Sequence, residues 1–313
     1  MIDPEDGRAL SSELWPALPL DEWADTYATL HMWTQVVGKI RLARAPMVNH
    51  WWQVTLYVTS RGLTTGPIPD GQRTFQIDFD LIDHRLIIET STGERRELPL
   101  ESRTVAEFYR DVFAALASLG IDVRIWTRPV EVEQSIPFEQ DRQHATYDAA
   151  HAARFFAALV QADRVMKRAR SGFTGKCSPV HFFWGAFDLA LTRFSGRRAP
   201  LHPGGIPNVA DRVMHEAYSH ECASCGFWPG GGAVKEPAFY AYAYPEPAGF
   251  AEFPIRPEQA YYSTEMREFV LPYERARESA DPDRTLLEFI QSTYEAAAEL
   301  GGWNRSELEA RRD

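Results

Sequence analysis

Apolar and polar residues alternate strictly around residues 75–88, and this alternation constrains the fold more than any other feature of the chain. A period of two is typical of a β-strand with one buried face. If Asp83-His84 forms a two-residue loop, Leu81 pairs with Leu86 and Phe79 with Ile88, so the apolar side chains share one face. The segment therefore predicts an antiparallel hairpin, whose apolar residues are Phe75, Ile77, Phe79, Leu81, Leu86 and Ile88.

Other periodic segments define the fold class. Helical spacing of apolar residues predicts helices at 22–43, 104–119, about 155–166 and 284–299. Alternation predicts strands at 52–59, 121–126, 180–194 and 240–244, whereas Gly, Pro and Thr mark 61–71 as a loop. Because strand–helix–strand alternation is not sustained, we expect an α+β fold in which helices pack on antiparallel β-sheets. The elements form two loosely similar halves, each with a helix followed by a hairpin.

A polar segment between the halves holds Pro129 and Pro137 and shows neither period. We place a soft internal boundary there, near 128–146. It separates an N-terminal half, 1–127, from a C-terminal half, 147–313.

Charge and composition exclude several classes of protein. The net charge of −11 and the pI near 5.4 argue against a nucleic-acid partner, which needs clustered Lys and Arg. No stretch reaches the roughly 20 apolar residues of a membrane-spanning helix, and the N-terminus does not resemble a signal peptide. Three cysteines cannot build a disulfide framework. We therefore expect a cytoplasmic protein with reduced thiols and no membrane partner.

Residues whose side chains can take part in catalysis or metal binding concentrate between 176 and 232. Gly185 suits the first central position of a type II′ turn, and a two-residue loop at 185–186 pairs Phe183 with Asp188 and His181 with Ala190. His181 and Asp188 then become diagonal neighbours on one sheet face. The pair is interpreted as an acid–base or metal-binding histidine oriented by a carboxylate. The alternative is a structural sheet histidine satisfied by a nearby acid.

A second group of such residues follows Asn208, which can cap a helix running to about Glu221. If that helix docks on the same sheet, His220 or Glu221 approaches His181. We accordingly predict His181, Asp188, His220 and Glu221 as catalytic residues, with His181, His220 and Glu221 as ligands of a divalent metal ion. Metal-free proton transfer by the same residues is the alternative.

Cations and aromatic residues near this group suggest substrate contacts. Cations can hold an anionic group and aromatic rings can form walls. The predicted binding residues are Lys176, Trp184, Arg193, Arg197, Trp228 and Tyr244. Cys222 and Cys225 have redox or zinc spacing, but without a second pair of ligands they are interpreted as incidental thiols.

Several segments carry a family resemblance. They are Asn49-His50-Trp51-Trp52, Thr74 to Asp80, Lys176 to Gly185, Thr192 to Arg197, Glu216 to Glu221 and Gly226 to Gly231. With these segments the chain resembles a bacterial family designated domain of unknown function 5996. The similarity covers nearly the whole chain and implies a single integrated unit, 1–313. It implies no activity.

We expect an enzyme that acts on a small polar, anionic molecule through a His and carboxylate site. Two alternatives remain open. One is a non-catalytic protein that binds a small molecule in the same pocket, and the other is a protein-interaction module.

Overall fold

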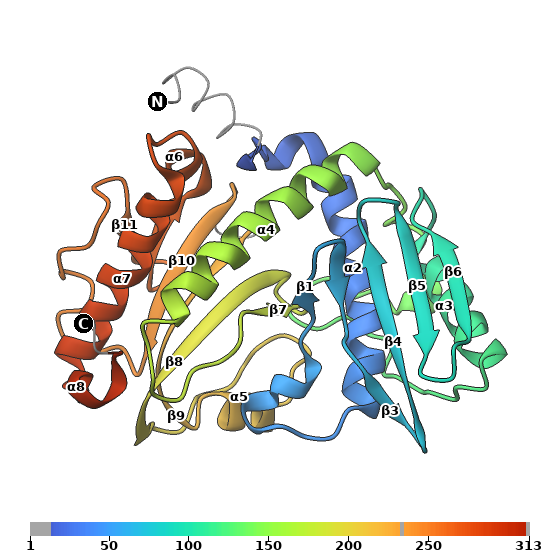
Figure 1. Cartoon of the computed structure of the whole chain (residues 1–313), viewed down its shortest axis with the longest axis horizontal. Coiled ribbons are helices and arrows are strands. Elements are labelled where there is room, and N and C mark those ends of the chain that lie inside the picture. The colour runs from blue at the N-terminus through green and yellow to red at the C-terminus, as the bar shows by residue number, and fades with distance from the viewer. Residues whose placement is uncertain (1–13, 232–234, 311–313) are drawn as a thin grey trace.

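Two antiparallel β-sheets and the helices around them form the protein (Figure 1). The structure is a computed structural model that describes residues 14–231 and 235–310. The first sheet has the order β1-β2-β4-β5-β6, with β3 also paired to β4, and the second has the order β11-β12-β10-β9-β8-β7. The strands of the first sheet are β1 (Tyr57–Val58), β2 (Gly62–Thr64), β3 (Ile68–Asp70), β4 (Arg73–Asp80), β5 (Arg85–Thr90) and β6 (Arg95–Pro99). Those of the second are β7 (His181–Phe183), β8 (Asp188–Arg198), β9 (His220–Trp228), β10 (Ala238–Tyr244), β11 (Tyr261–Ser263) and β12 (Glu268–Pro272).

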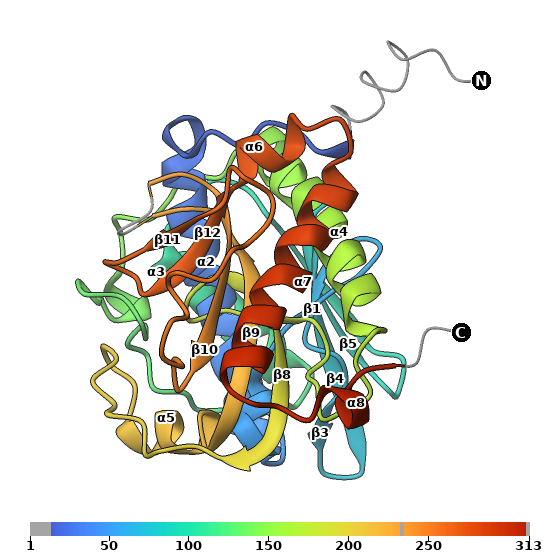
Figure 2. The same ribbon diagram turned by 90° about the vertical axis from the view of Figure 1, so that its left-hand side faces the viewer.

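The helices give each sheet a covered face. The α-helices that lie entirely within the described ranges are α2 (Leu20–Arg44), α3 (Val105–Ser118), α4 (Ala149–Arg170), α5 (Asp211–Ala217), α6 (Tyr273–Arg277), α7 (Pro282–Leu300) and α8 (Arg305–Leu308). The same ranges contain two 3₁₀-helices, η1 (Asn49–Val54) and η2 (Phe138–Gln140). Figures 1 and 2 show α4 and α7 side by side on one face of the second sheet. Helix α2 lies between the two sheets, and its Trp33 stacks on Phe108 of α3.

The predicted α+β class and both predicted hairpins are confirmed. The pairs Phe183–Asp188 and His181–Ala190 occur as expected, although Phe187, with φ 61°, and not Gly185 takes the left-handed conformation in the turn. In the first hairpin Phe79 lies opposite Leu86, not Ile88, because residues 81–84 form the connection. A shift of two residues keeps every side chain on its face, so the apolar face is preserved.

Four local predictions were wrong. Of residues 52–59, the first three belong to η1, in which His50 and Trp51 have left-handed φ angles of 58° and 61°, and only Tyr57–Val58 form a strand. The expected loop at 61–71 contains β2 and β3, and 121–126 has no strand partner and is irregular. The expected helix from Asn208 to Glu221 ends at Ala217, since pairing with β8 and β10 places His220 and Glu221 in β9.

The two faces of the second sheet differ in composition. Along β8, Leu189 and Leu191 are fully buried on the side of α4 and α7. Asp188, Ala190 and Thr192 alternate with them and so face the other way. The corresponding positions of β9 and β10 are also small or polar, which leaves space above this face.

The buried apolar side chains of both sheets belong to one hydrophobic cluster. Whether the two halves form one folding unit stays a prediction. Of the helices in the described ranges, none combines the length and the apolar character needed to cross a membrane.

Candidate functional site

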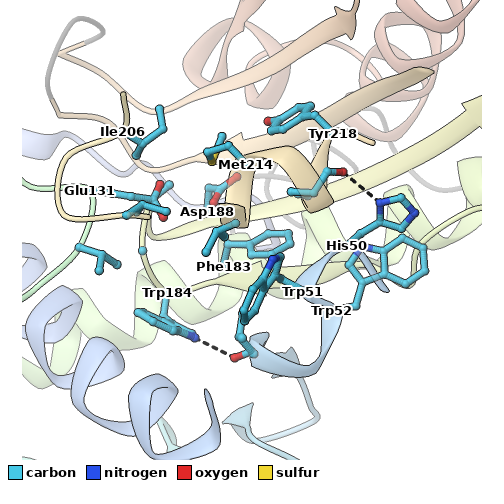
Figure 3. Close-up of a pocket in the computed structure, with 18 of the residues that line it drawn as sticks. His50, Trp51, Trp52, Glu131, Phe183, Trp184, Asp188, Ile206, Met214 and Tyr218 are labelled. Carbon is cyan, nitrogen blue, oxygen red and sulfur yellow. Dashed lines mark hydrogen bonds between the residues drawn. The ribbon is translucent and has the colours of Figure 1, made fainter. Parts of the chain in front are cut away.

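A cavity of about 760 Å³ lies above the open face of the second sheet. Its floor is formed by β7 to β10 and β12, and its sides by α2, η1 and the segments 124–131 and 206–218 (Figure 3). The polar positions of the floor therefore face a space large enough for a small organic molecule.

Tryptophan side chains dominate the walls. Five of the nine tryptophans in the chain line the cavity: Trp51, Trp52, Trp126, Trp184 and Trp228. Trp184 is fixed by a hydrogen bond of 2.7 Å from its Nε1 to the carbonyl oxygen of Val54, and it packs so tightly on Gly38 of α2 that a Cβ there would collide with the indole. The walls are thus apolar, flat and held in place.

Asp188 and Tyr240 form the polar centre of the floor. Asp188 is only 7% exposed, and its Oδ2 accepts a hydrogen bond from the Tyr240 hydroxyl. The Tyr240 ring passes over Gly226 of β9 to reach β8. A Cβ at position 226 would collide with this ring and with the Leu189 carbonyl oxygen. Within the described residues no other side chain donates to the Asp188 carboxyl, so Oδ1 remains available to a ligand.

Two further carboxyl groups share the cavity with Asp188. Burial raises the pKa of Asp188 to about 7, despite the opposing hydrogen bond from Tyr240. Burial, reinforced by the charge of Asp188, also raises the pKa values of Glu131 and Glu268 to about 7. Glu131 is exposed overall, but it lines the cavity and its carboxyl packs against Gly185. All three groups can exchange protons near neutral pH.

Unusual backbone conformations cluster at this cavity. Among the described residues other than glycine, seven have positive φ, and four of them line the cavity: His50, Trp51, Glu131 and Asn208. Such conformations cost roughly 1–3 kcal/mol each and persist only where contacts hold them. The backbone N–H of His50 donates to Glu216 Oε1 at 3.1 Å, and that of Glu131 donates to the Pro207 carbonyl at 2.8 Å.

His50 also links the cavity to Lys176. Its Nδ1 lies 3.0 Å from the carbonyl oxygen of Ala217 and therefore donates to it, which leaves Nε2 to accept from Lys176 Nζ at 2.6 Å. Burial, followed by the charge of Lys176, lowers the pKa of His50, so the ring stays neutral. Lys176 is thus held by His50 and does not line the cavity.

Three of the predicted site residues do line the cavity: Asp188, Trp184 and Trp228. His181 does not. It is 1% exposed, lies beneath Trp52 and Tyr57, and neither ring nitrogen has a hydrogen-bond partner in the described parts of the chain. Asp188 bonds to Tyr240 and not to His181, so the expected orienting contact is absent there, and burial lowers the pKa of His181 to about 3.

The other predicted residues have structural contacts elsewhere. Glu221 accepts from Ser195 and Arg197 on the side of β9 away from the cavity. Arg193 is buried, with its guanidinium over the Tyr294 ring and a hydrogen bond to the Ala169 carbonyl. Tyr244 donates to the Pro200 carbonyl and does not line the cavity.

The register of the strands keeps His181 and His220 too far apart for the metal site predicted from the sequence. His181 lies level with Ala190 and Gly226, whereas His220 is six residues from Gly226 along β9, or about 20 Å of strand. Ligands at about 2 Å from one ion cannot span that distance. In the part of the chain that the structure describes, no group of three or more His, Cys, Asp or Glu could hold a metal ion.

Sequence reasoning missed Lys39, Glu131, Tyr240 and Glu268. The tyrosine alternation of 240–244 was visible, but its link to Asp188 depends on strand pairing across Gly226. One usable signal was the run of small residues at Ala190, Thr192, Ser224 and Gly226, which leaves room above the middle of this sheet face.

The cysteine prediction leads to a direct test. Cys222 and Cys225 are buried, three residues apart on β9 and hence on opposite faces, and burial raises both pKa values to about 12. We expect a thiol reagent at pH 8 to leave both unmodified in the native protein, and the double alanine variant to fold and keep its ligand response. Loss of bound zinc or of a redox activity in that variant would contradict this.

The fold and the site define an α+β protein with two antiparallel sheets and a tryptophan-walled cavity over a floor of carboxyl groups. The chain belongs to the family of unknown function DUF5996, which matches residues 15–310. This confirms the resemblance seen in the sequence. No curated protein and no solved structure matches the chain.

Proposed function

We propose that the protein is an enzyme that binds a small, largely apolar molecule in this cavity and transfers a proton through Asp188. The observation that carries the proposal is the carboxyl of Asp188, nine-tenths buried beneath the cavity, whose Oδ2 accepts from Tyr240 and whose Oδ1 accepts from no side chain of the described residues. A carboxyl with a pKa near 7 in an apolar site suits acid–base catalysis at neutral pH.

The proposed ligand is less polar than the sequence alone suggested. Arg193, Arg197 and Lys176, the cations expected to hold an anionic group, are not among the cavity walls, although Lys39, Arg124 and Arg212 line the cavity. Five indole side chains favour a flat ring system instead. A metal ion is not needed, because the carboxyl groups themselves can exchange protons.

A non-catalytic binding protein is the second candidate, and it would use the same cavity. The mostly apolar walls favour it, since they supply affinity without chemistry. Turnover separates the two, because a binder is stabilised by its ligand and leaves it unchanged.

The proposal includes a small-molecule partner and a cytoplasmic location. Support comes from three unpaired cysteines, as expected in a reducing compartment, and from the net charge of −11, which disfavours nucleic acid.

The test is a thermal-shift screen of ring-containing compounds on the full chain, followed by mass spectrometry for turnover. We expect some compounds to raise the melting temperature of the wild type but not of Asp188→Asn or of Ala190→Leu, which fills the floor. Glu221→Gln is the matched control, because this acid lies outside the cavity, and it should respond like the wild type. Stabilisation that survives in both cavity variants would overturn the proposal.

A further inference from the structure

Lys39 is a buried amine without a partner. It lies near the end of α2, is 3% exposed and lines the cavity. No hydrogen bond or ion pair in the described ranges involves its Nζ. By contrast, Lys167 pairs with Asp163 at 2.6 Å, and Lys176 donates to His50.

Two indoles hold the Lys39 amine at the cavity. Its Nζ lies 4.8 Å from the ring centre of Trp126 and 5.9 Å from that of Trp184. Trp126 is 55% exposed, so the side chain that covers Lys39 is itself at the protein surface. Burial alone lowers its pKa to about 8, since no carboxylate is near enough to raise it. About a tenth of the amine is therefore neutral and nucleophilic at pH 7.

A second titratable group, Glu131, lines the same cavity. Gln35, one helical turn before Lys39, holds Val130 by two hydrogen bonds of 2.9 Å: its Nε2 donates to the Val130 carbonyl, and its Oε1 accepts from the Val130 N–H. This clamp places the next residue, Glu131, beside α2, with its carboxyl at the cavity and a pKa of about 7. Both Glu131 and Lys39 line the cavity that would hold the bound molecule.

We propose that Lys39 is a covalent site, at which the amine attacks the carbonyl carbon of an aldehyde or ketone bound in the cavity. The new C–N bond gives a carbinolamine, and its C–O bond then breaks. Oxygen leaves as water with two protons, both of which the neutral amine gives up in net terms, and a neutral imine remains. Glu131 donates a proton to the departing oxygen and recovers one from the nitrogen. The inference rests on the proposed function in using the same cavity, and it narrows the substrate class to carbonyl compounds.

The test is to treat the full-length protein with benzaldehyde, trap imines with sodium borohydride and map the benzylated lysines by mass spectrometry. The chain has only four lysines: Lys39, Lys167, Lys176 and Lys235. We expect labelling of Lys39 at pH 8 at least tenfold above Lys167, and only about a twofold rise from pH 8 to pH 10. An ordinary lysine, with a pKa near 10.4, rises on the order of 50-fold over the same range.

Two variants separate a covalent site from other roles. Lys39→Arg keeps the charge and the packing on the indoles but has no nucleophilic amine, so the adduct should vanish while compounds still stabilise the protein. Glu131→Gln should slow adduct formation at least tenfold. Labelling of Lys39 no faster than Lys167, or without a plateau above pH 8, overturns the inference. If Lys39 is unlabelled but the compounds still need Asp188 to stabilise the protein, only the inference about Lys39 fails. If Lys39 is labelled but the compounds stabilise the protein without Asp188, only the proton-transfer role of Asp188 fails.

Discussion

Asp188→Asn should make the protein more stable above pH 7, although it removes the group proposed to act in the site. The folded state holds the Asp188 proton up to about pH 7, whereas the unfolded chain releases it near 3.8. The folded state therefore binds more protons between these values, and its stability falls as pH rises through this window. The loss is fully developed above pH 7 and amounts to about 4 kcal/mol.

Asparagine has no charge to bury and can still accept the hydrogen bond from Tyr240. The difference in unfolding free energy between variant and wild type should be small at pH 4, grow to pH 7 and then stay constant. A rise in melting temperature on the order of 5–10 °C at pH 8 would follow. Urea unfolding of both proteins at each pH measures the difference, and a variant less stable than wild type at pH 8 would contradict the proposed burial of this charge.

His181→Phe should stabilise the protein most at acid pH. The pKa of His181 is about 3 in the folded state and about 6.5 in the unfolded chain. Between these pH values the unfolded chain binds a proton at His181, whereas the folded state does not. Stability is thus lost as pH falls from 6.5 towards 3, by about 2 kcal/mol at pH 5. Phenylalanine removes this loss and also the two nitrogens that lack partners.

The same variant separates a structural from a catalytic His181. A ring that only packs among Trp52, Tyr57 and Phe183 can be replaced without losing the ligand response. His181→Leu, which has no ring, serves as the control for shape. If either variant unfolds more easily at pH 5 than the wild type, or no longer responds to compounds that stabilise it, the assigned structural role is wrong.

Local patterns predicted part of this structure, and pairing between distant segments decided the rest. The register of β7 and β8 followed from a short turn, and it placed Asp188 on the open face correctly. His220 was assigned to a helix because the residues before it have helical spacing, but pairing of β9 with β8 and β10 outweighs that preference. Lys39 gave no signal, because a lysine in an apolar helix is ordinarily exposed at its tip.

The ionisation of Asp188 is the measurement that tests the proposed site most directly. In full-length protein labelled with ¹³C-aspartate, the carboxyl resonance absent from Asp188→Asn identifies this residue, and its chemical shift can be followed from pH 4 to pH 9. A midpoint at about 7 is the expected result. A midpoint near the ordinary value of 3.8 would mean that the carboxyl is solvated and charged at neutral pH, and would contradict a proton-transfer site in an apolar cavity.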